Sequence, residues 1–315
     1  MSIPQVDLLH FLHGTDSQKK QFVCDLGSAF ETVGFVSVIN HGLTDDLIDS
    51  LYKDVAEFFS LPVSLKKTYE ITNLAGQRGY TSFGKEHAKG SDAPDLKEFF
   101  QYGQPKPPAI ALANEQYVPN VNVKEIATFN NNLKQAYYSF EYAGAALLKA
   151  IALHLSLNED FFSAHIKDGN SIIRAIHYPP ITSEPNSSIR AEQHEDINLI
   201  TLLVGASADG LQILSKTNEW LSVKASPGAI VVNVGDMLQR LTNNKLKSTT
   251  HRVVNPPREL WSTSRFSIPF FLHPKSDMSL ACLDCCITSD TPKAYDDYTA
   301  GQYLDERLRE IGLKK

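Results

Sequence analysis

Residues 191–203 read AEQHEDINLITLL, and this stretch decides how the rest of the chain is interpreted. If the backbone is extended here, side chains two residues apart share a face, so His194 and Asp196 converge while Glu195 faces away. One imidazole and one carboxylate hold a metal ion weakly, so a third ligand is expected. His251 lies in a second strand-like segment and is the obvious candidate. Two imidazoles and one carboxylate form the facial triad that leaves neighbouring coordination positions open on Fe(II).

A further pattern follows His251 in the chain. Residues 264–273 read SRFSIPFFLH, and their alternation puts Arg265 and Ser267 on one face of a strand. The opposite face is apolar and consists of Phe266, Ile268, Phe270 and Leu272. An arginine beside a hydroxyl suits a carboxylate that is held from two directions. We therefore expect the apolar face to lie outward under helices, while the polar face lines a small barrel that binds a ligand.

Short strands dominate the second half of the chain. They are expected at residues 171–178, 199–204, 210–214, 220–223, 229–234, 247–254 and 265–272. Residues 126–155 instead carry apolar side chains at helical spacing, which predicts a long helix with one buried stripe. Many short strands with histidines and a carboxylate on facing edges indicate an α+β fold, with a double-stranded β-helix (jelly-roll) core flanked by helices.

The first part of the chain is expected to be more helical. Thr15 begins a capping-box pattern, followed by apolar residues at helical spacing up to Gly34. Residues 35–39 then predict a strand, and Thr44 is the expected cap of a second helix. Clustered glycines and prolines in residues 73–119 predict loops with short elements.

The composition is that of an ordinary soluble globular protein. The 315 residues are 42% hydrophobic and 21% charged, enough for one large domain or two smaller ones. The net charge of −6 leaves no basic footprint, so nucleic acid is not an expected partner. No secretory signal is evident, and the most apolar helical stretch, residues 143–155, is too short to cross a bilayer. We therefore expect no membrane partner.

Four cysteines occur, three of them close together at Cys282, Cys285 and Cys286. A zinc site built on the C-x-x-C spacing would need a second pair, and the sequence has none. Reduced thiols in a cytoplasmic protein are the preferred interpretation, and ferrous iron also suits a reducing compartment.

These patterns together resemble a known family. His194-x-Asp196, His251 and Arg265-x-Ser267 are similar to the signature of the non-haem Fe(II), 2-oxoglutarate-dependent oxygenases, in the isopenicillin N synthase-like branch. Further similar segments occur in the family's order at residues 3–8, 34–43, 177–180 and 241–244. A histidine and an aspartate with one residue between them are weak evidence alone, whereas five landmarks in order are specific.

The resemblance implies the fold inferred above and an oxidoreductase activity. The implied metal ligands, which are also the implied catalytic residues, are His194, Asp196 and His251. Arg265 and Ser267 would bind the distal carboxylate of 2-oxoglutarate, and Tyr178 would donate its hydroxyl to the same cosubstrate. Ile176 replaces an asparagine common in plant members, which removes one expected contact to 2-oxoglutarate.

The implied reaction consumes 2-oxoglutarate and dioxygen and releases succinate and carbon dioxide. Hydroxylation of a small molecule is the default outcome, with desaturation or ring closure as the other possibilities. Pocket candidates are named by position alone, and they are Tyr80, Phe99, Arg174 and Leu238. They suit a small amphipathic acid, an amino acid or peptide, or a secondary metabolite. His41, His177 and His273 are interpreted as structural.

The resemblance also gives a division of the chain. Residues 1–120 correspond to an N-terminal helix and strand region, residues 121–275 to the bracing helix and the jelly-roll core, and residues 276–315 to a tail with a helix. A single compact unit is expected. In the family such a tail packs near the mouth of the cavity.

Three other functions remain open at this stage. An oxidase like isopenicillin N synthase takes all its electrons from the substrate and has the same Arg-x-Ser pair, but residues 312–315 lack the glutamine-bearing end of that enzyme. A ligand-binding relative could retain the cavity without turnover, although the intact triad argues against it. A zinc-dependent hydrolase could use the same three ligands, but it would leave Arg265 and Ser267 without a task.

Overall fold

Twelve strands form two sheets in the part of the chain that the structure, a computed structural model, describes. That part comprises residues 3–71, 74, 76–85, 95–105, 118–185, 188–205, 209–224 and 226–310. The residues at 312–315 that argued against an oxidase lie outside it, as does much of the expected loop region.

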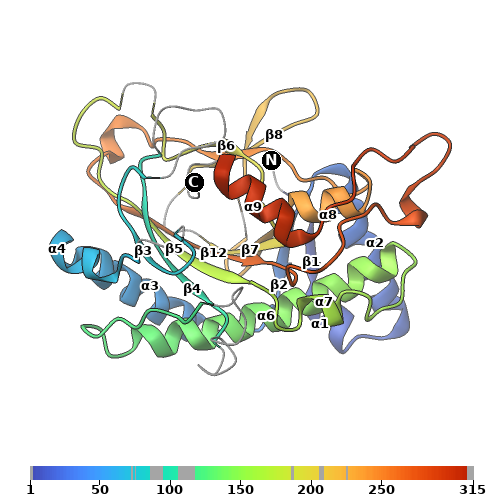
Figure 1. Cartoon of the computed structure of the whole chain (residues 1–315), viewed down its shortest axis with the longest axis horizontal. Coiled ribbons are helices and arrows are strands. Elements are labelled where there is room, and N and C mark those ends of the chain that lie inside the picture. Colours follow the sequence, from blue (N-terminus) through green and yellow to red (C-terminus); the bar gives the residue numbers. More distant parts are fainter. Residues whose placement is uncertain are drawn as a thin grey trace.

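The larger sheet has eight strands, and all its neighbours pair antiparallel except β1 and β2. In spatial order they are β1 (Gln5–Asp7), β2 (Phe35–Ile39), β10 (Ile230–Val234), β7 (Ile200–Val204), β12 (Arg265–Leu272), β5 (Ile172–Tyr178), β4 (Glu98–Gly103) and β3 (Gly79–Thr81). The smaller sheet has four antiparallel strands in the order β6 (Ala191–His194), β11 (His251–Val253), β8 (Leu211–Leu214) and β9 (Trp220–Ser222). Two facing antiparallel sheets with helices around them confirm the expected α+β jelly roll (Figure 1).

Helices cover the outside of the larger sheet. The helices described are α1 (Leu8–Leu12), α2 (Asp16–Thr32), α3 (Asp45–Ser60), α4 (Val63–Lys66), α6 (Phe129–His154), α7 (Ser163–Ile166), α8 (Asp236–Leu241) and α9 (Ala300–Glu310). Three 3-10 turns complete the set at η1 (Lys67–Tyr69), η2 (Arg258–Leu260) and η3 (Asp284–Cys286). None of the described helices is both long enough and apolar enough to span a membrane.

The starts of the first long helices follow from their caps. The side chain of Thr15 accepts a hydrogen bond from the backbone of Gln18, and the side chain of Gln18 accepts one from the backbone of Thr15, which is the expected capping box of α2. Thr44 caps α3 in the same way through Leu47. Gly34 ends the first unit in the left-handed region at φ 77°, where a side chain would meet Thr249 and Lys247.

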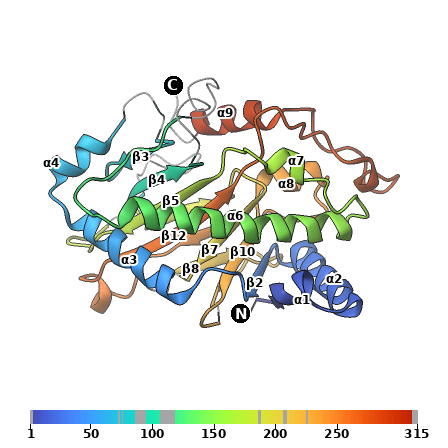
Figure 2. The same cartoon turned by 90° about the horizontal axis from the view of Figure 1, so that it is seen from below.

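The core lies between α6 and the outer face of the larger sheet (Figure 2). Phe140 of α6 stacks on Phe270 of β12 with ring centroids 5.3 Å apart. Gly144 lets the helix approach more closely still, since a β-carbon there would lie 2.3 Å from Leu272. The apolar face of β12 therefore points outward under a helix, as the alternation in the sequence predicted.

The segment expected to consist mainly of loops contributes a sheet edge. β4 is buried along its whole length and pairs with β5, which places Phe99 opposite Ile176. Phe99, Ile176 and Tyr178 then pack against Ala191 and Val253 of the smaller sheet. These side chains fill the space between the two sheets and close one end of the barrel.

Candidate active site

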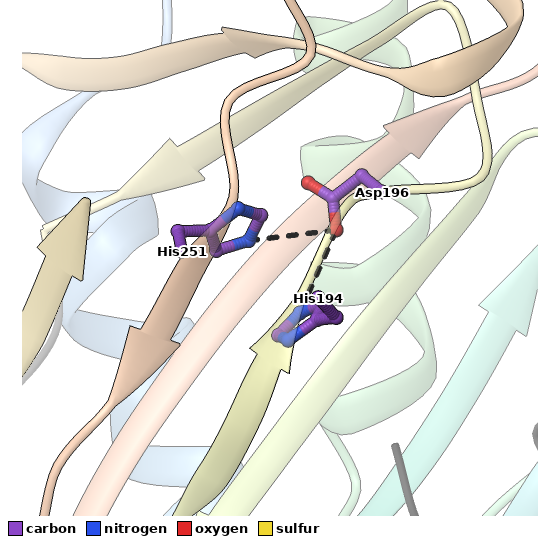
Figure 3. Close-up of side chains that lie close together, drawn as sticks. All are labelled: His194, Asp196 and His251. Carbon is purple, nitrogen blue, oxygen red and sulfur yellow. Dashed lines mark ion pairs between the residues drawn. The ribbon is translucent and has the colours of Figure 1, made fainter. Parts of the chain in front are cut away.

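Three polar side chains converge where the two sheets face each other. His194 ends β6, His251 begins β11, and the two residues are cross-strand partners with ring centroids 4.5 Å apart. Oδ1 of Asp196 lies 3.9 Å from Nε2 of His194 and 3.8 Å from Nε2 of His251 (Figure 3). The three donor atoms lie within 4.8 Å of one another.

The route by which Asp196 reaches this point differs from the expectation. β6 ends at His194, and a bend follows at residues 197–199, so Asp196 lies beyond the paired strand. Glu195 consequently does not face away: it accepts a hydrogen bond from Thr250 and lines the cavity beside the triad. The prediction that His194 and Asp196 converge is confirmed, but the prediction that Glu195 faces away is wrong.

The second ring nitrogen of each histidine is occupied by the backbone. Nδ1 of His194 lies 2.6 Å from the carbonyl oxygen of Glu192, and Nδ1 of His251 lies 3.1 Å from that of Thr249. A carbonyl oxygen only accepts, so Nδ1 carries the proton in both rings and Nε2 keeps its lone pair. Both lone pairs are thus available to a metal ion.

The Asp196 carboxylate is divided in the same manner. Its Oδ2 accepts hydrogen bonds from Thr201 at 2.6 Å and from Asn233 at 2.8 Å, and Asn198 in turn donates to Thr201. Oδ1 is thereby held toward the histidines. Neighbouring strands β7 and β10 supply Thr201 and Asn233, so the larger sheet fixes the orientation of this ligand.

The electrostatics favour the ligand forms of Asp196 and His194. Burial alone would raise the pKa of Asp196, but the two histidines and the hydrogen bonds from Asn233 and Thr201 outweigh it and lower that pKa. Desolvation and the neighbouring His251 lower the pKa of His194. The site therefore presents one anionic oxygen and a neutral imidazole at neutral pH.

The donor set fits a first-row metal ion. Imidazole nitrogen and carboxylate oxygen bind such ions at about 2.1 Å, so two ligands of one ion lie no more than roughly 4.2 Å apart. The separations of 3.8 and 3.9 Å from Asp196 Oδ1 satisfy that limit. Two imidazoles and one carboxylate are also the set that suits Fe(II).

Arg265 and Ser267 lie on the inner face of β12, as predicted. Arg265 is 2% exposed and pairs across the strands with Tyr178, whose ring centroid lies 4.9 Å from its guanidinium carbon. Ser267 is also buried and pairs with Ile176. The structure thus brings Arg265, Ser267 and Tyr178 together between the sheets.

A cavity of about 430 Å³ opens beside the triad. Its wall includes His194 and Asp196 on one side and Arg174 with Phe271 on another. The guanidinium carbon of Arg174 lies 4.3 Å from the ring centroid of Phe99 and 5.3 Å from that of Phe271, so the arginine is stacked between two rings. Helix α9 contributes Leu304, Arg307 and Leu308 to the rim, as the resemblance implied for the tail.

Of the four pocket candidates only Arg174 lines this cavity: Phe99 lies against Arg174, and the other two lie elsewhere. Tyr80 is on the outer side of the larger sheet, where its hydroxyl donates to Glu98, and it borders a second, smaller hollow. Leu238 is fully buried in α8 within the apolar core. Neither side chain is among those that line the cavity beside the triad.

Two family models match the chain. The first, described as the N-terminal region of a non-haem dioxygenase in morphine synthesis, matches residues 3–125, and the 2OG-Fe(II) oxygenase superfamily model matches residues 169–274. The proline hydroxylase buaE of Petromyces alliaceus is 30% identical, over 98% of this chain and 99% of its own length. The chain belongs to the 2OG-Fe(II) oxygenase superfamily.

Solved structures resemble the oxygenase over nearly its whole length. A 2OG-Fe(II) oxygenase family protein from Caulobacter crescentus is 42% identical with a TM-score of 0.87, over 98% of this chain and 99% of that one. A full-length Neurospora crassa protein in complex with alpha-KG and thymine is 27% identical with a TM-score of 0.86, over 98% of this chain and 96% of that one. The protein is an oxidoreductase that uses Fe(II), 2-oxoglutarate and dioxygen.

Several cavity residues of the oxygenase escaped the sequence interpretation. His273 continues the odd-numbered inner face of Arg265 and Ser267, so the alternation of β12 contained a signal for it. Burial lowers the pKa of His273 to about 4, which keeps its ring neutral. Lys97 and Gln101 lie on the same strand face as Phe99, but no pattern in the sequence predicted that this segment belongs to the sheet.

The other two histidines interpreted as structural do have structural partners. His41 bonds to the carbonyl of Gly228 and to the amide of Leu43. His177 bonds to Glu98 and to Ser264 on the outer side of the larger sheet.

Proposed function

We propose that His194, Asp196 and His251 hold the Fe(II) of this oxygenase. The observation that carries the proposal is the convergence of two Nε2 atoms and one Oδ1 atom whose companion atoms all have protein partners. When bound, iron and 2-oxoglutarate supply the oxidising power that yields succinate, carbon dioxide and an oxidised, by default hydroxylated, substrate. The chain's own part is to fix the ligands before the metal arrives.

We propose that Arg265 and Ser267 bind the distal carboxylate of 2-oxoglutarate and that Tyr178 donates its hydroxyl to the same molecule. A buried guanidinium and a buried hydroxyl on one strand face can hold a carboxylate from two directions. Their burial between the sheets also excludes water, which strengthens the interaction. Ile176 opposite Ser267 supplies apolar surface where an asparagine would have supplied a hydrogen bond.

We propose a substrate that is small and carries a carboxylate or carbonyl oxygen. The cavity of about 430 Å³ suits a molecule of that size, and Arg174 on its wall can donate to such an oxygen. Phe99 supports Arg174 from behind, so it acts as a positioning residue. The similar proteins named above, a proline hydroxylase and the Neurospora crassa protein in complex with thymine, agree with a substrate of this kind. The geometry gives no support for contacts from Tyr80 or Leu238.

Anaerobic titration of the Fe(II) protein tests the assignment of the cosubstrate. Adding 2-oxoglutarate should produce a weak visible charge-transfer band, and Arg265→Met should shift the titration to higher concentrations. Substrate should then be lost in step with succinate formation. A protein that oxidises its substrate with no band and no succinate would instead be a substrate-only oxidase, and one with neither turnover nor succinate would be a ligand-binding relative.

We also propose that the oxygenase acts as one unit in the cytoplasm, without nucleic acid or membrane partners. Residues 1–120, 121–275 and 276–315 all contribute side chains to the same apolar core, which supports a single unit. The four cysteines are free, which suits a reducing compartment. Cell fractionation and a single cooperative unfolding transition would test these points.

A further inference from the structure

Arg190 is a buried cation that the site described so far does not use. It is 2% exposed and directly precedes β6. Its Nη2 donates to the backbone carbonyl of Thr263 at 3.2 Å. Among the residues that the structure describes, its Nε has no hydrogen-bond partner and no carboxylate oxygen lies within 4 Å of its guanidinium. A buried arginine in this situation is costly unless an anion joins it.

The guanidiniums of Arg190 and Arg265 both lie near the ring of Tyr178. The guanidinium carbon of Arg190 lies 5.9 Å from the ring centroid of Tyr178, and that of Arg265 lies 4.9 Å from it. Burial lowers the pKa of Arg190 to about 10, and the charge of Arg265 adds to that effect. The two cations are therefore close enough to repel each other in a region of low dielectric constant.

A carboxylate bound by both arginines would offset the unpaired charge of Arg190 and reduce the repulsion between the two cations. A carboxylate has about four lone-pair sites, and one guanidinium with one hydroxyl does not fill them. Resting on the proposed function, we propose that Arg190 is a second guanidinium of the subsite for the distal carboxylate of 2-oxoglutarate, beside Arg265 and Tyr178. The two buried guanidiniums would then favour 2-oxoglutarate over keto acids that lack a distal carboxylate.

The position of Arg190 in the chain gives this subsite a fixed relation to the metal site. Arg190 lies four residues before His194, and the intervening backbone is β6, which is paired to β11. One short strand thus joins Arg190, proposed to bind one end of the cosubstrate, to His194. His194 is a proposed ligand of the iron, which binds the other end. Such a rigid connection orients the cosubstrate with little loss of entropy on binding.

The test is the affinity of catalytically silent protein for two keto acids. In protein loaded with Mn(II), Arg190→Met should weaken 2-oxoglutarate binding, measured by calorimetry, by roughly 10- to 100-fold, because hydrogen bonds to charged groups contribute that much. Binding of 2-oxobutanoate, which has no distal carboxylate, should change less than about twofold, and so should binding of Mn(II). Arg252→Met is the matched control, since that guanidinium stacks on Trp220 from the adjacent strand β11.

The outcomes separate this inference from the proposed function. Equal weakening of both keto acids by Arg190→Met, or no weakening of either, would overturn the inference and leave Arg190 as a structural residue. Arg265→Met without effect on 2-oxoglutarate would overturn the proposed cosubstrate site instead. If Arg190→Met does not fold, Arg190→Lys can replace it, because lysine keeps the charge but loses the two parallel donors of the guanidinium. This variant should also weaken the binding of 2-oxoglutarate more than that of 2-oxobutanoate.

Discussion

Two buried clusters of titratable groups lie on opposite sides of the larger sheet, and they have different fates. On the inner side is the triad of His194, Asp196 and His251. On the outer side Glu98 of β4 binds Lys66, His177 and Tyr80, and it too is a carboxylate with a histidine beside it. Both clusters combine burial with charge, so neither property distinguishes a metal site from a structural one.

The difference lies in what each atom has left to bind. Lys66 donates to both oxygens of Glu98 at 2.8 and 2.9 Å and to the carbonyl of Phe59 at 3.0 Å. His177 uses both ring nitrogens, one on Glu98 and one on Ser264. The outer cluster is therefore saturated within the chain. In the triad, one atom of each side chain is satisfied and the other points at a shared centre (Figure 3).

Replacing one histidine in each cluster should produce the largest difference between the two clusters. His251→Ala should abolish stoichiometric iron binding and lower the rate of succinate formation by roughly 1,000-fold or more, since it removes a metal contribution of several kcal/mol. His177→Ala should leave the iron content unchanged. Iron analysis and a succinate assay measure both variants. Iron retained by the first variant, or lost by the second in folded protein, would contradict the distinction.

Removing the outer carboxylate should affect stability and not iron. Glu98→Gln leaves the Lys66 charge buried without a counterion, which costs about 3–5 kcal/mol of unfolding free energy. Glu159→Gln is the matched control, because its ion pair with Lys19 lies at the partly exposed surface and contributes about 0–1 kcal/mol. Urea unfolding followed by circular dichroism gives both values. Similar losses in the two variants would show that burial of the Glu98 pair has no energetic consequence.

A smaller effect is expected at the atom of Asp196 that faces away from the histidines. Thr201→Val removes the donor to Oδ2 and should weaken iron binding by about 10- to 100-fold while the fold persists. Competition with a chelator measures the affinity. Thr68→Val, which alters an exposed hydroxyl bonded to the carbonyl of Leu65, serves as the control and should bind iron normally. Equal iron affinity in the two variants would show that the hydrogen bond from Thr201 does not contribute to iron binding.

The smallest expected effect is the pH dependence of the unfolding free energy that the outer cluster contributes. Burial alone would raise the pKa of Glu98, but hydrogen bonds from His177, Lys66 and Tyr80 hold it below its ordinary value of 4.5. A lowered folded pKa means that its stabilisation is fully present above pH 4.5 and is lost as pH falls through the folded value. The difference in unfolding free energy between the native protein and Glu98→Gln should therefore narrow below pH 4.5. A constant difference down to about pH 3 would refute this assignment.

The sequence predicted the inner site because most of its residues lie in two local patterns, and His251 was added as the expected third ligand. His194 and Asp196 are two residues apart, and the alternation around Arg265 and Ser267 reports directly which face is buried. The jelly roll could also be predicted, because its short strands are separated by clear turn signals. α6 was predicted from its stripe and was found within three residues of the expected ends.

The parts that were missed depend on contacts between distant segments. Thr201 and Asn233 orient Asp196 only because β7 and β10 lie beside each other in the sheet. β4 lies in a region rich in glycine and proline, and its strand character comes from pairing with β5 and not from its own pattern. Arg190 resembles any other arginine in the sequence until its burial beside Arg265 is known.

The short strand β6 contains a register shift with a consequence for the whole site. Two residues separate Ala191 from His194, while only one separates their partners on β11, so β6 carries one extra residue. Ala191 packs between the sheets, and the bulge that accommodates the extra residue lets His194, three positions further on, point to the same side. A regular strand of the same length would turn the imidazole outward, whereas removing the extra residue would restore the two-position spacing of β11 and keep it inward. The location of the metal thus depends on a local irregularity, which brings inside the barrel an imidazole that strict alternation would place outside it.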